Sequence, residues 1–254
     1  MDDNLVLGID IGGSSVKGGV VDVSRGSMAS DRFEIPHHPL PKLTVLTSSI
    51  SEIQKKSGYE GNQVGIGFPG VVSSSKVFNG PNIDEGVWGT VLRDSLGESG
   101  LDGTLLNDAD AALYHAIRNT EACVGQNTVL MITIGTSIGT ALAQDGRLVR
   151  NLELGRIYDA DGYRIDENAS QRSRLANNMS TDDWIRKLTN AILQVSLSTN
   201  PDMILLGGGV TESPQGWFDR IQLGIPIQIA PGSNRAGLIG AACWHRDVNR
   251  KARL

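Results

Sequence analysis

The chain has 254 residues, of which 39% are hydrophobic and 20% charged, and its formal net charge is −5. This size and composition are typical of a globular protein with one large or two modest domains, and the acidic balance argues against general affinity for nucleic acid. No apolar run approaches the length of a membrane span, and the N-terminus does not resemble a signal peptide. The two cysteines, Cys123 and Cys243, lie outside any paired motif, which argues against disulfides and a structural zinc. We therefore expect a cytoplasmic protein without a membrane or nucleic-acid partner.

The first half of the chain is predicted to combine strands and helices. The strands lie at residues 5–10, 17–23, 28–35 and 64–70. The first two are joined by the glycine-rich turn GGSS, and the fourth ends in a Pro-Gly turn. Apolar residues at helical spacing predict a helix over 42–56, and a second helix over about 109–119 follows the apolar stretch GTLLN. His37 and His38 are expected in a surface loop, PHHPLP.

The second half repeats this plan. A strong strand over 128–135 is followed by a hairpin that turns on Asp145-Gly146, and the stretches DMILLGGGV and IPIQIA are further strands. The clearest helix covers 180–197 and begins with a capping box at Ser180. The polar stretch before it has weak periodicity. A last helix, RAGLIGAACWH, follows the final strand.

A strand, a glycine turn and a second strand thus occur twice, at 5–23 and 128–150. This duplication predicts an α/β protein with two lobes around a cleft, because no linker rich in proline or serine separates the halves. We expect one lobe to comprise residues 1–108 with 236–254, and the other to comprise residues 109–235.

The stretch GIDIGGSSVKGG, residues 8–19, is the first candidate ligand site. Gly12 and Gly13 allow close approach of the backbone and a positive φ, and consecutive N–H groups in such a turn form an anion-binding nest. Asp10 would face the same space, where a carboxylate beside phosphates suits Mg²⁺ held through water. A tight hairpin with a surface aspartate explains these residues equally well. The stretch is neither a Walker loop nor a Rossmann fingerprint.

Two further glycine-rich turns have a similar character. In ITIGTSIGTAL, 132–142, hydroxyls alternate with glycines and offer donors for phosphate oxygens. The recurrence of this pattern favours ligand binding over a solvated hairpin. LLGGGV, 205–210, follows a buried strand and precedes a predicted helix, whose N-terminus would favour an anion. A plain left-handed turn is the alternative there.

The stretch NDAD places Asn107 and Asp108 where a strand gives way to a helix. Either residue is a good helix cap, but ligands also bind at the carboxyl ends of strands in open α/β sheets. Phosphoryl transfer to an alcohol needs a base for the hydroxyl proton, and Asp108 meets that need. Asp110 is expected to be a surface charge that stabilises the helix dipole. His115, in the same helix, is expected to be packed rather than catalytic.

Seven stretches together resemble the repressor/ORF/kinase (ROK) sugar kinases of the actin-like ATPase superfamily. They are GIDIGGSSVK, GIGFPGVV, NDADAA, ITIGTSIGTAL, NLELG, NPDMILLGGGV and NRAGLIGAA, in the family's order and over nearly the whole chain. The likeness is greatest to the polyphosphate branch of the family, which also lacks the usual ROK zinc cluster. The resemblance implies a duplicated actin-like, ribonuclease H-like α/β fold. It also implies a glycolytic kinase, commonly dimeric, that uses Mg²⁺ and either ATP or polyphosphate to phosphorylate the 6-hydroxyl of glucose.

The resemblance further implies roles for individual residues. Asp108 would be the base that takes the proton of the sugar 6-hydroxyl. The residues that would line the sugar pocket are Gly70, Asn82, Asn107, Glu153 and Arg156. The residues that would bind the donor are Asp10, Gly12, Gly13, Ser14, Lys17, Gly135, Thr136, Gly207, Gly208 and Gly209. Asp10 would also hold Mg²⁺ through water.

The sugar motif departs from the family pattern Glu-Leu-Gly-His-Leu-Glu. Arg156 replaces the histidine and Tyr158 replaces the second glutamate. A guanidinium only donates hydrogen bonds, whereas an imidazole can also accept them, and the change to tyrosine removes a carboxylate. Ser137 stands where the second phosphate turn usually has glycine. Three explanations are open: weaker glucose binding, a different or anionic hexose paired with Arg156, or a sugar- or phosphate-binding regulator with little turnover. The retained Asp10 and Asp108 favour an active kinase.

The phosphoryl donor is not decided by charge. Residues 147–187 contain eight basic residues, but seven acidic residues share the stretch. Such a mixture is typical of a solvated face rather than a polyphosphate track, so the polyphosphate assignment rests on the resemblance. A DNA-binding ROK repressor is disfavoured because the first phosphate strand starts at residue 5. The sugar-motif remnants PNID and ELG disfavour an actin-like filament or a chaperone.

Overall fold

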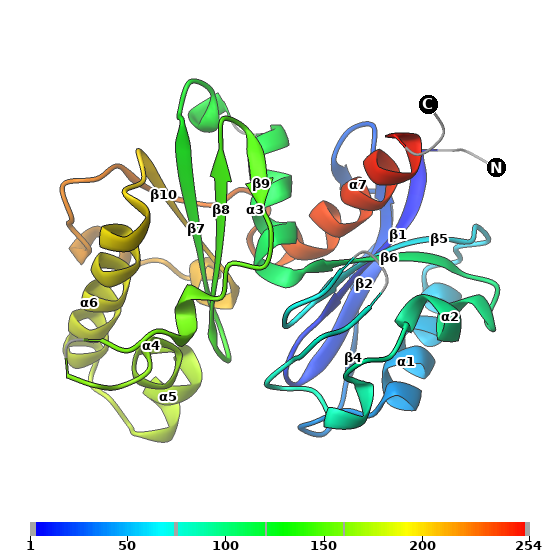
Figure 1. Cartoon of the computed structure of the whole chain (residues 1–254), viewed down its shortest axis with the longest axis horizontal. Coiled ribbons are helices and arrows are strands. Elements are labelled where there is room, and N and C mark those ends of the chain that lie inside the picture. Colours follow the sequence, from blue (N-terminus) through cyan, green and yellow to red (C-terminus); the bar gives the residue numbers. More distant parts are fainter. Residues whose placement is uncertain (1–3, 74–75, 120, 160, 252–254) are drawn as a thin grey trace. The chain divides into compact units, whose positions relative to one another are not determined.

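The computed structural model describes residues 4–73, 76–119, 121–159 and 161–251. The chain forms two compact units, Met1–Asn119 with Arg235–Leu254, and Thr120–Asn234. Each unit is built on one mixed β-sheet (Figure 1). Among the described residues, none of the helices combines the length and apolar character that a membrane crossing requires.

The sheet of the first unit has the strand order β3-β2-β1-β5-β6, and β4 also pairs with β2. Its strands are β1 (Leu5–Ile11), β2 (Ser15–Asp22), β3 (Ser27–Met28), β4 (Phe33–Pro36), β5 (Gln63–Phe68) and β6 (Asp102–Asn107). β1 and β2 form an antiparallel hairpin, whereas β1, β5 and β6 run parallel. The carboxyl ends of these three parallel strands therefore lie at one edge of the sheet.

Helices cover both faces of this sheet. They are α1 (Leu43–Lys56), α2 (Leu92–Gly97), α3 (Asp108–Asn119) and α7 (Ala236–Lys251). Because successive side chains of a strand point to opposite faces, Ile9 of β1 shares a core with Ile50 of α1, while Val6 packs with Leu238 of α7. In Figure 1, α7 (red) lies beside β1 (blue), and a Cβ at Gly8 would be 2.4 Å from the Leu238 carbonyl oxygen.

The sheet of the second unit has the order β11-β10-β7-β8-β9. Its strands are β7 (Thr128–Ile134), β8 (Ile138–Gln144), β9 (Arg147–Val149), β10 (Met203–Gly207) and β11 (Ile227–Ile229). The predicted hairpin is confirmed, because Gln144 pairs with Arg147 around Asp145 and Gly146. Both turn residues have a positive φ, of 50° and 70°, as a two-residue hairpin loop of the primed type requires.

The long helix α6 (Thr181–Thr199) begins at the predicted N-cap, Ser180. The Ser180 hydroxyl accepts the Asp183 N–H at 3.1 Å and donates to the Asp183 carboxylate at 2.8 Å. The apolar face of the helix is buried, and Trp184 and Leu188 are fully buried. Local capping and apolar spacing therefore agree with the tertiary packing, which explains why this helix could be predicted from sequence.

Several elements differ from the sequence expectation. The weak strand near 28–35 is two short strands, β3 and β4. The polar stretch before α6 contains α4 (Ile165–Ala169) and α5 (Gln171–Ala176), and α2 had not been predicted. The short 3-10 helices of the described residues are η1 (Glu85–Val87), η2 (Glu121–Cys123), η3 (Leu154–Arg156), η4 (Gly209–Glu212), η5 (Phe218–Arg220) and η6 (Ser233–Arg235).

The expected domain boundary at residue 108 falls at the start of α3, but α3 belongs to the first unit. Its packing against α7 explains this placement. A Cβ at Gly240 of α7 would lie only 1.8 Å from the Ala111 carbonyl oxygen of α3, so the two helix backbones are almost in contact. Near the other end of α3, both the Tyr114 hydroxyl and the Arg118 guanidinium bind the Asp247 carboxylate of α7. Helix α3 is thus held in the first unit by α7, although α7 follows the second unit in the sequence.

The expectation that His115 is packed is confirmed, since its side chain is buried on α3. Burial, together with the smaller effect of the positive charge on nearby Arg118, lowers the pKa of His115 to about 4. A histidine that is buried in its neutral form must take up a proton when the chain unfolds in acid.

This shift predicts a loss of stability in mild acid. Above pH 6.5 both the folded and unfolded forms hold His115 neutral, so its contribution is fully present there. As the pH falls from 6.5 towards 4, only the unfolded chain gains the proton, and the free energy of unfolding should fall by about 3 kcal/mol from this residue alone. Urea unfolding of the wild type and His115→Gln between pH 7 and 4 measures the effect. The variant should lose less stability than the wild type, whereas exposed His38→Gln should lose as much. Equal losses in all three proteins would contradict the prediction.

Candidate active site

The carboxyl ends of β1, β5 and β6 bring Asp10 and Asp108 to the same edge of the first sheet. Asp10 pairs with Gly67 in the ladder between β1 and β5, and Phe68 pairs with Asn107 in the ladder between β5 and β6. A Cβ at Gly67 would lie 3.6 Å from Asp10 Oδ1 and 3.7 Å from Asp108 Cα. Gly67 therefore separates the two aspartates without a side chain of its own, which leaves space between them.

Asn107, and not Asp108, caps α3. Its Oδ1 accepts the Asp110 N–H at 3.0 Å, and its Nδ2 donates to the Gly70 carbonyl oxygen at 3.1 Å. Asp108 is the first helical residue and is partly exposed, and its Oδ1 accepts the Ala109 N–H at 2.8 Å. The two neighbouring residues thus have different roles. The buried Asn107 caps the helix, and the partly exposed Asp108 offers a carboxylate at its first turn.

The expectation that Asp110 is a surface charge is wrong, because its side chain is fully buried on the face of α3 that packs into the unit. The helical repeat of 3.6 residues turns position 110 inward when position 108 faces the carboxyl edge of the sheet.

The residues predicted to line the sugar pocket in this unit lie on neighbouring loops. Gly70 follows β5 and is pressed against the segment before Asn82, because a Cβ at Gly70 would lie 2.1 Å from the Asn79 carbonyl oxygen. The Ile83 N–H donates to the Gly80 carbonyl oxygen, which closes the turn that holds Asn82. Since Asn107 bonds to Gly70, the capping residue also positions this turn.

The first glycine turn is a tight link between β1 and β2. The Gly12 N–H donates to the Ser15 carbonyl oxygen at 2.9 Å, and Ser14 is exposed at the tip. Neither Gly12 nor Gly13 is among the residues with a positive φ, so that part of the expectation is wrong. The hairpin register continues up to Ile11 and Val16, and the chain reverses direction between them without a left-handed residue.

A row of charged residues crosses the strands beside this turn. In the strand ladders, Asp10 on β1 lies opposite Lys17 on β2, and Lys17 lies opposite Glu34 on β4. Glu34 accepts the Ser15 hydroxyl at 2.7 Å and pairs with Arg32 at 3.4 Å. Removal from water raises the pKa of Asp10, while the positive charges of Lys17 and Arg32 act in the opposite direction. A cation near Asp10 would restore its charged form.

The first turn of α7 also lies against Asp10. A Cβ at Gly237 would be 3.3 Å from the Asp10 carboxyl carbon and 3.4 Å from Oδ1. The first N–H groups of a helix have no partner within the helix and carry partial positive charge, so this end of α7 favours an anion at Asp10. A larger residue than glycine at position 237 would crowd the carboxylate.

In the second unit, a segment that sequence reasoning had left unassigned holds the second glycine turn. The Gly135 N–H donates to the Ser137 carbonyl oxygen at 3.0 Å, which closes the turn. The Gln171 N–H donates to the Gly135 carbonyl oxygen at 3.0 Å, and Arg172 Nε donates to the Thr136 carbonyl oxygen at 3.1 Å. No local sequence signal links α5 to this turn, because the contact joins positions more than 30 residues apart.

The ELG motif is fixed beside this turn. A Cβ at Gly155 would lie 2.0 Å from the carbonyl oxygen of Ile138, the first residue of β8. The Thr140 hydroxyl donates to the Leu152 carbonyl oxygen and accepts the Leu154 N–H. Thr140 is also buried, so the expectation that this hydroxyl helps bind phosphate is wrong; it shapes the backbone around Glu153 instead.

The two unusual residues of the sugar motif differ in their surroundings. Arg156 Nε lies 3.1 Å from Glu153 Oε2, one turn along η3, and both side chains are partly exposed. The substituted arginine is therefore bound to the glutamate that the resemblance assigns to the sugar. Tyr158 is 67% exposed.

The third glycine turn follows β10. Gly208 has a φ of 88°, and a Cβ there would lie 2.4 Å from the Ile134 carbonyl oxygen, so only glycine fits. The helix expected after this turn is the four-residue 3-10 helix η4, which is too short for a helix dipole of any strength. Gly209 instead lines a cavity of about 470 Å³ together with Trp184 and Trp217. The Arg174 guanidinium, which also borders it, lies over the Trp184 ring at 4.6 Å.

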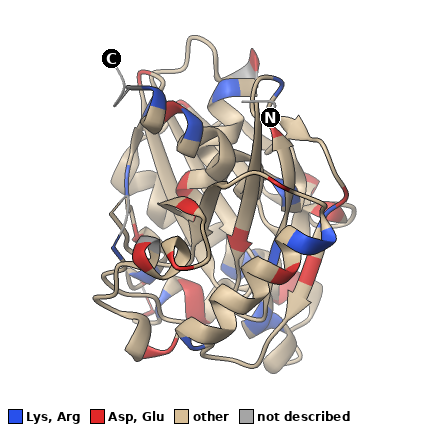
Figure 2. Ribbon diagram, turned by 90° about the vertical axis from the view of Figure 1, so that its right-hand side faces the viewer, with Lys and Arg blue, Asp and Glu red and all other residues tan. Residues whose placement is uncertain are grey.

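Several basic side chains within residues 147–187 are held in ion pairs. Arg164 pairs with Asp166 and Glu167, and Arg186 pairs with Asp183. In the view of Figure 2, which looks onto the first unit, Lys and Arg are likewise interspersed with Asp and Glu along the ribbon. This agrees with the mixed-charge interpretation of the sequence.

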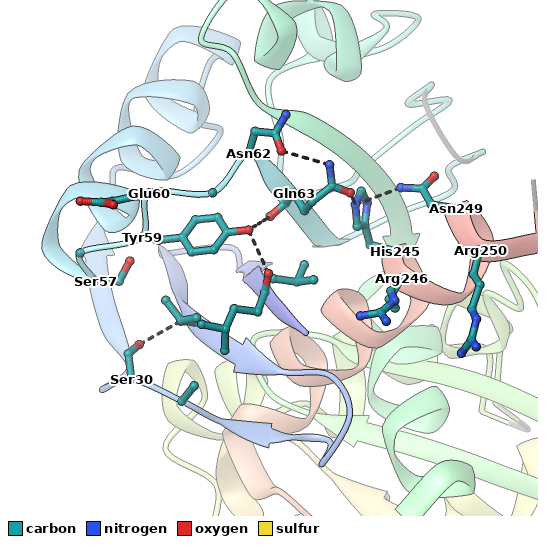
Figure 3. A pocket seen from close by; sticks show the side chains of 16 residues that line it. Ser30, Ser57, Tyr59, Glu60, Asn62, Gln63, His245, Arg246, Asn249 and Arg250 are labelled. Carbon is teal, nitrogen blue, oxygen red and sulfur yellow. Dashed lines mark hydrogen bonds between the residues drawn. The ribbon is translucent and has the colours of Figure 1, made fainter. Parts of the chain in front are cut away.

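A cavity of about 930 Å³ in the first unit lies at the opposite edge of the sheet, at the amino ends of β1 and β5 (Figure 3). The Tyr59 hydroxyl there is 3.1 Å from the carbonyl oxygens of both Leu5 and Gln63. His245 Nε2 is 2.8 Å from Gln63 Oε1. The cavity is therefore separate from Asp10 and Asp108, which lie at the carboxyl ends of the strands.

The model of the ROK family matches residues 6–155, which include the first and second glycine turns, Asp108 and Glu153. The chain belongs to the ROK family. This ROK chain is 32% identical to a polyphosphate glucokinase of Mycobacterium tuberculosis over 242 residues, which cover 93% of this chain and 89% of that protein. It is 31% identical to a polyphosphate glucokinase of Mycobacterium leprae over 93% of this chain and 73% of that protein.

Solved structures confirm the fold expected of a ROK protein. The inorganic polyphosphate/ATP-glucomannokinase of Arthrobacter sp. strain KM matches with a TM-score of 0.89 at 29% identity, over 97% of this chain and all of that one. A ROK glucokinase of Streptomyces griseus, solved with glucose and AMPPNP, matches with a TM-score of 0.79 at 23% identity, over 96% of this chain and 99% of that one. The mixed α/β architecture with one sheet in each unit is thus that of the actin-like ROK sugar kinases.

Proposed function

We propose that this ROK protein is a sugar kinase that transfers a phosphoryl group from polyphosphate or ATP to the 6-hydroxyl of glucose, with Asp108 as general base. The observation that supports this most strongly is the position of Asp108, partly exposed on the first turn of α3 and separated from Asp10 only by Gly67. The similarity to polyphosphate glucokinases over 93% of the chain supports the same reaction.

In the proposed reaction, the sugar 6-hydroxyl lies within hydrogen-bonding distance of the Asp108 carboxylate. As the hydroxyl oxygen attacks the terminal phosphorus of the donor, its proton passes to Asp108, and the bond from that phosphorus to the bridging oxygen breaks. The products are the sugar 6-phosphate and a donor shortened by one phosphoryl group.

The residues present fit Mg²⁺ held through water by Asp10. Mg²⁺ usually retains several waters and binds one or two carboxylates together with substrate phosphates. Within the described part of the chain, no group of three or more His, Cys, Asp or Glu side chains forms a protein cage for a metal, so a single carboxylate beside the first glycine turn is the suitable arrangement. When bound, the ion neutralises charge on the donor phosphates.

For the donor, we propose two contributions from the second unit. The turn at Gly135 and Thr136, supported by Arg172, offers backbone groups to phosphate oxygens. The cavity of about 470 Å³ beside Gly209 is large enough to take a nucleotide base. Inorganic polyphosphate needs only the first of these, so the structure is compatible with both donors.

A matrix of hexoses against donors tests the proposal. Glucose, mannose and an anionic hexose that keeps its 6-hydroxyl, such as glucose 1-phosphate, are each assayed with ATP and with polyphosphate, with and without Mg²⁺. We expect phosphorylation of glucose by at least one donor, dependent on Mg²⁺. No transfer to any hexose from either donor would refute the kinase assignment and favour a sugar-binding regulator.

The ion pair between Arg156 and Glu153 predicts that both residues tune sugar selection. Arg156→His with Tyr158→Glu restores the family pattern, releases Glu153 from its arginine partner and returns a second carboxylate, so KM for glucose should fall, by roughly 3- to 10-fold if two hydrogen bonds improve. Steady-state kinetics measure the change, with Arg147→His, on β9, as the control. An unchanged or higher KM for glucose, with a loss of activity on another hexose, would indicate a different natural acceptor.

We further propose that the enzyme acts in the cytoplasm, at the entry of glucose into glycolysis, as a homodimer. These three points come from the resemblance to ROK sugar kinases. Sedimentation velocity at micromolar concentration tests the dimer.

A further inference from the structure

The cavity of about 470 Å³ in the second unit is lined by both the third glycine turn and helix α5. Gly209 contributes from the turn, and Gln171 and Arg174 contribute from α5. The Gln171 N–H also donates to the Gly135 carbonyl oxygen of the second glycine turn at 3.0 Å. The cavity therefore adjoins the turn to which the proposed function assigns donor phosphates, and all of these residues belong to one unit.

Arg174 is the one charged side chain among the described residues that line this cavity. Its guanidinium lies 4.6 Å from the centre of the Trp184 ring, and its Nη2 donates to the Thr181 hydroxyl at 3.0 Å. Within the described part of the chain, no carboxylate forms an ion pair with it, whereas Arg186 is paired with Asp183. The cavity thus carries a positive charge that the described residues do not neutralise.

The contacts of Arg174 hold the guanidinium in place without using all of its N–H groups. Trp184 is fully buried, and its indole N–H donates to the Ala169 carbonyl oxygen, so it offers the arginine only the face of its ring. A ring face attracts a cation through its electrostatic field. The guanidinium has five N–H donors in one plane, of which the Thr181 hydroxyl accepts one. An arginine that is held in this way suits an anion with several acceptor oxygens, such as a phosphate group.

We infer that Arg174 is a specificity-determining residue for the donor: its guanidinium binds phosphate groups of inorganic polyphosphate that extend past the second glycine turn. This inference rests on the proposed function, in which that turn binds donor phosphates. A polyphosphate chain is negatively charged along its whole length, so the phosphates beyond the turn gain from the charge of Arg174. ATP ends in an uncharged base, which would fill the same cavity without an ion pair. Arg174 should therefore favour polyphosphate over ATP.

Steady-state kinetics of Arg174→Gln with each donor test this. We expect the KM for long-chain polyphosphate to rise roughly 10- to 30-fold, the size expected for one lost charge-assisted hydrogen bond, and the KM for ATP and for glucose to change by less than about 3-fold. Arg186→Gln is the matched control, because it removes an arginine of the same unit that lies outside this cavity and is paired with Asp183. It should keep the wild-type KM for both donors. An equal rise for ATP and polyphosphate, or no rise for either, would overturn the inference.

A second variant separates the charge of Arg174 from its packing on Trp184. Arg174→Lys keeps the positive charge but loses the planar group. It should recover most of the affinity for polyphosphate that Arg174→Gln loses. A lysine variant as weak as the glutamine variant would mean that packing, and not charge, explains the loss, which would contradict the proposed role.

Equilibrium binding of long-chain polyphosphate without sugar separates this inference from the proposed function. Counterion release makes the affinity of a polyanion fall as the salt concentration rises, and the loss of one cationic contact should reduce the slope of log Kd against log salt concentration by about one. We expect the smaller slope in Arg174→Gln and the wild-type slope in Arg186→Gln. Equal slopes in the wild type and Arg174→Gln would overturn the inference even in an active kinase. A smaller slope in a protein that transfers no phosphoryl group would keep Arg174 as a polyphosphate contact and remove the kinase assignment.

Discussion

Replacement of Asp108 by asparagine is expected to lower kcat by roughly 10²- to 10⁴-fold, the usual contribution of a positioned general base. Asparagine has the same shape, and its carbonyl oxygen can still accept the Ala109 N–H that Asp108 Oδ1 accepts at 2.8 Å. The helix cap is unaffected, because Asn107 provides it. The variant therefore removes the proton acceptor and little else, and the KM for both substrates should change much less than kcat.

Asp102→Asn provides the matched control for this measurement. Asp102 is the first residue of the same strand, β6, and so lies at the opposite edge of the sheet from Asp108. Its variant should retain the wild-type kcat. Turnover within a few-fold of wild type in Asp108→Asn would exclude Asp108 as the base. An equal loss in both variants would point to a general defect of the strand.

Replacement of Gly240 by alanine is expected to destabilise the first unit by about 2–4 kcal/mol, although alanine favours a helix by about 1 kcal/mol over glycine. The added methyl group would lie 1.8 Å from the Ala111 carbonyl oxygen and 3.2 Å from the His115 backbone nitrogen. These are backbone atoms that no side-chain rotation can move, so α3 and α7 must separate. Because α3 begins at Asp108, kcat should fall as well. Urea unfolding at neutral pH measures the stability, and the assay for glucose phosphorylation measures kcat.

Gly97→Ala is the control, because Gly97 ends α2 with no atom near its Cβ position. Without crowding, the substitution should leave stability unchanged or raise it slightly, by up to about 1 kcal/mol. If Gly240→Ala were as stable as Gly97→Ala, the close packing of α3 on α7 would not be a determinant of stability.

Most elements could be predicted because their signals are local. In α6, the Ser180 cap and the apolar face that includes Trp184 agree within one stretch of chain. In the β8–β9 hairpin, Asp145-Gly146 supplies the two positive φ angles that the turn needs. The short helices α4 and α5 carry no such pattern, because each is too short to repeat an apolar spacing over several turns.

The roles within the candidate site were less accessible from sequence. The NDAD stretch indicated a cap and a carboxylate, but only the bonds to Gly70 and to the Asp110 N–H show that Asn107 is the cap. Arg172 had no distinguishing pattern, since it contacts a glycine turn more than 30 residues away in the chain.

The amino-acid sequence alone determined the alternation of strands and helices, the three glycine-rich turns and the family, because hydrophobic period, turn residues and motif order are properties of neighbouring positions. Only the tertiary structure decided which polar groups meet: Asp10 with the start of α7, Arg156 with Glu153, and Arg172 with the second turn. Such contacts depend on strand register and on helix packing, in which a shift of one residue exchanges one face of a strand for the other.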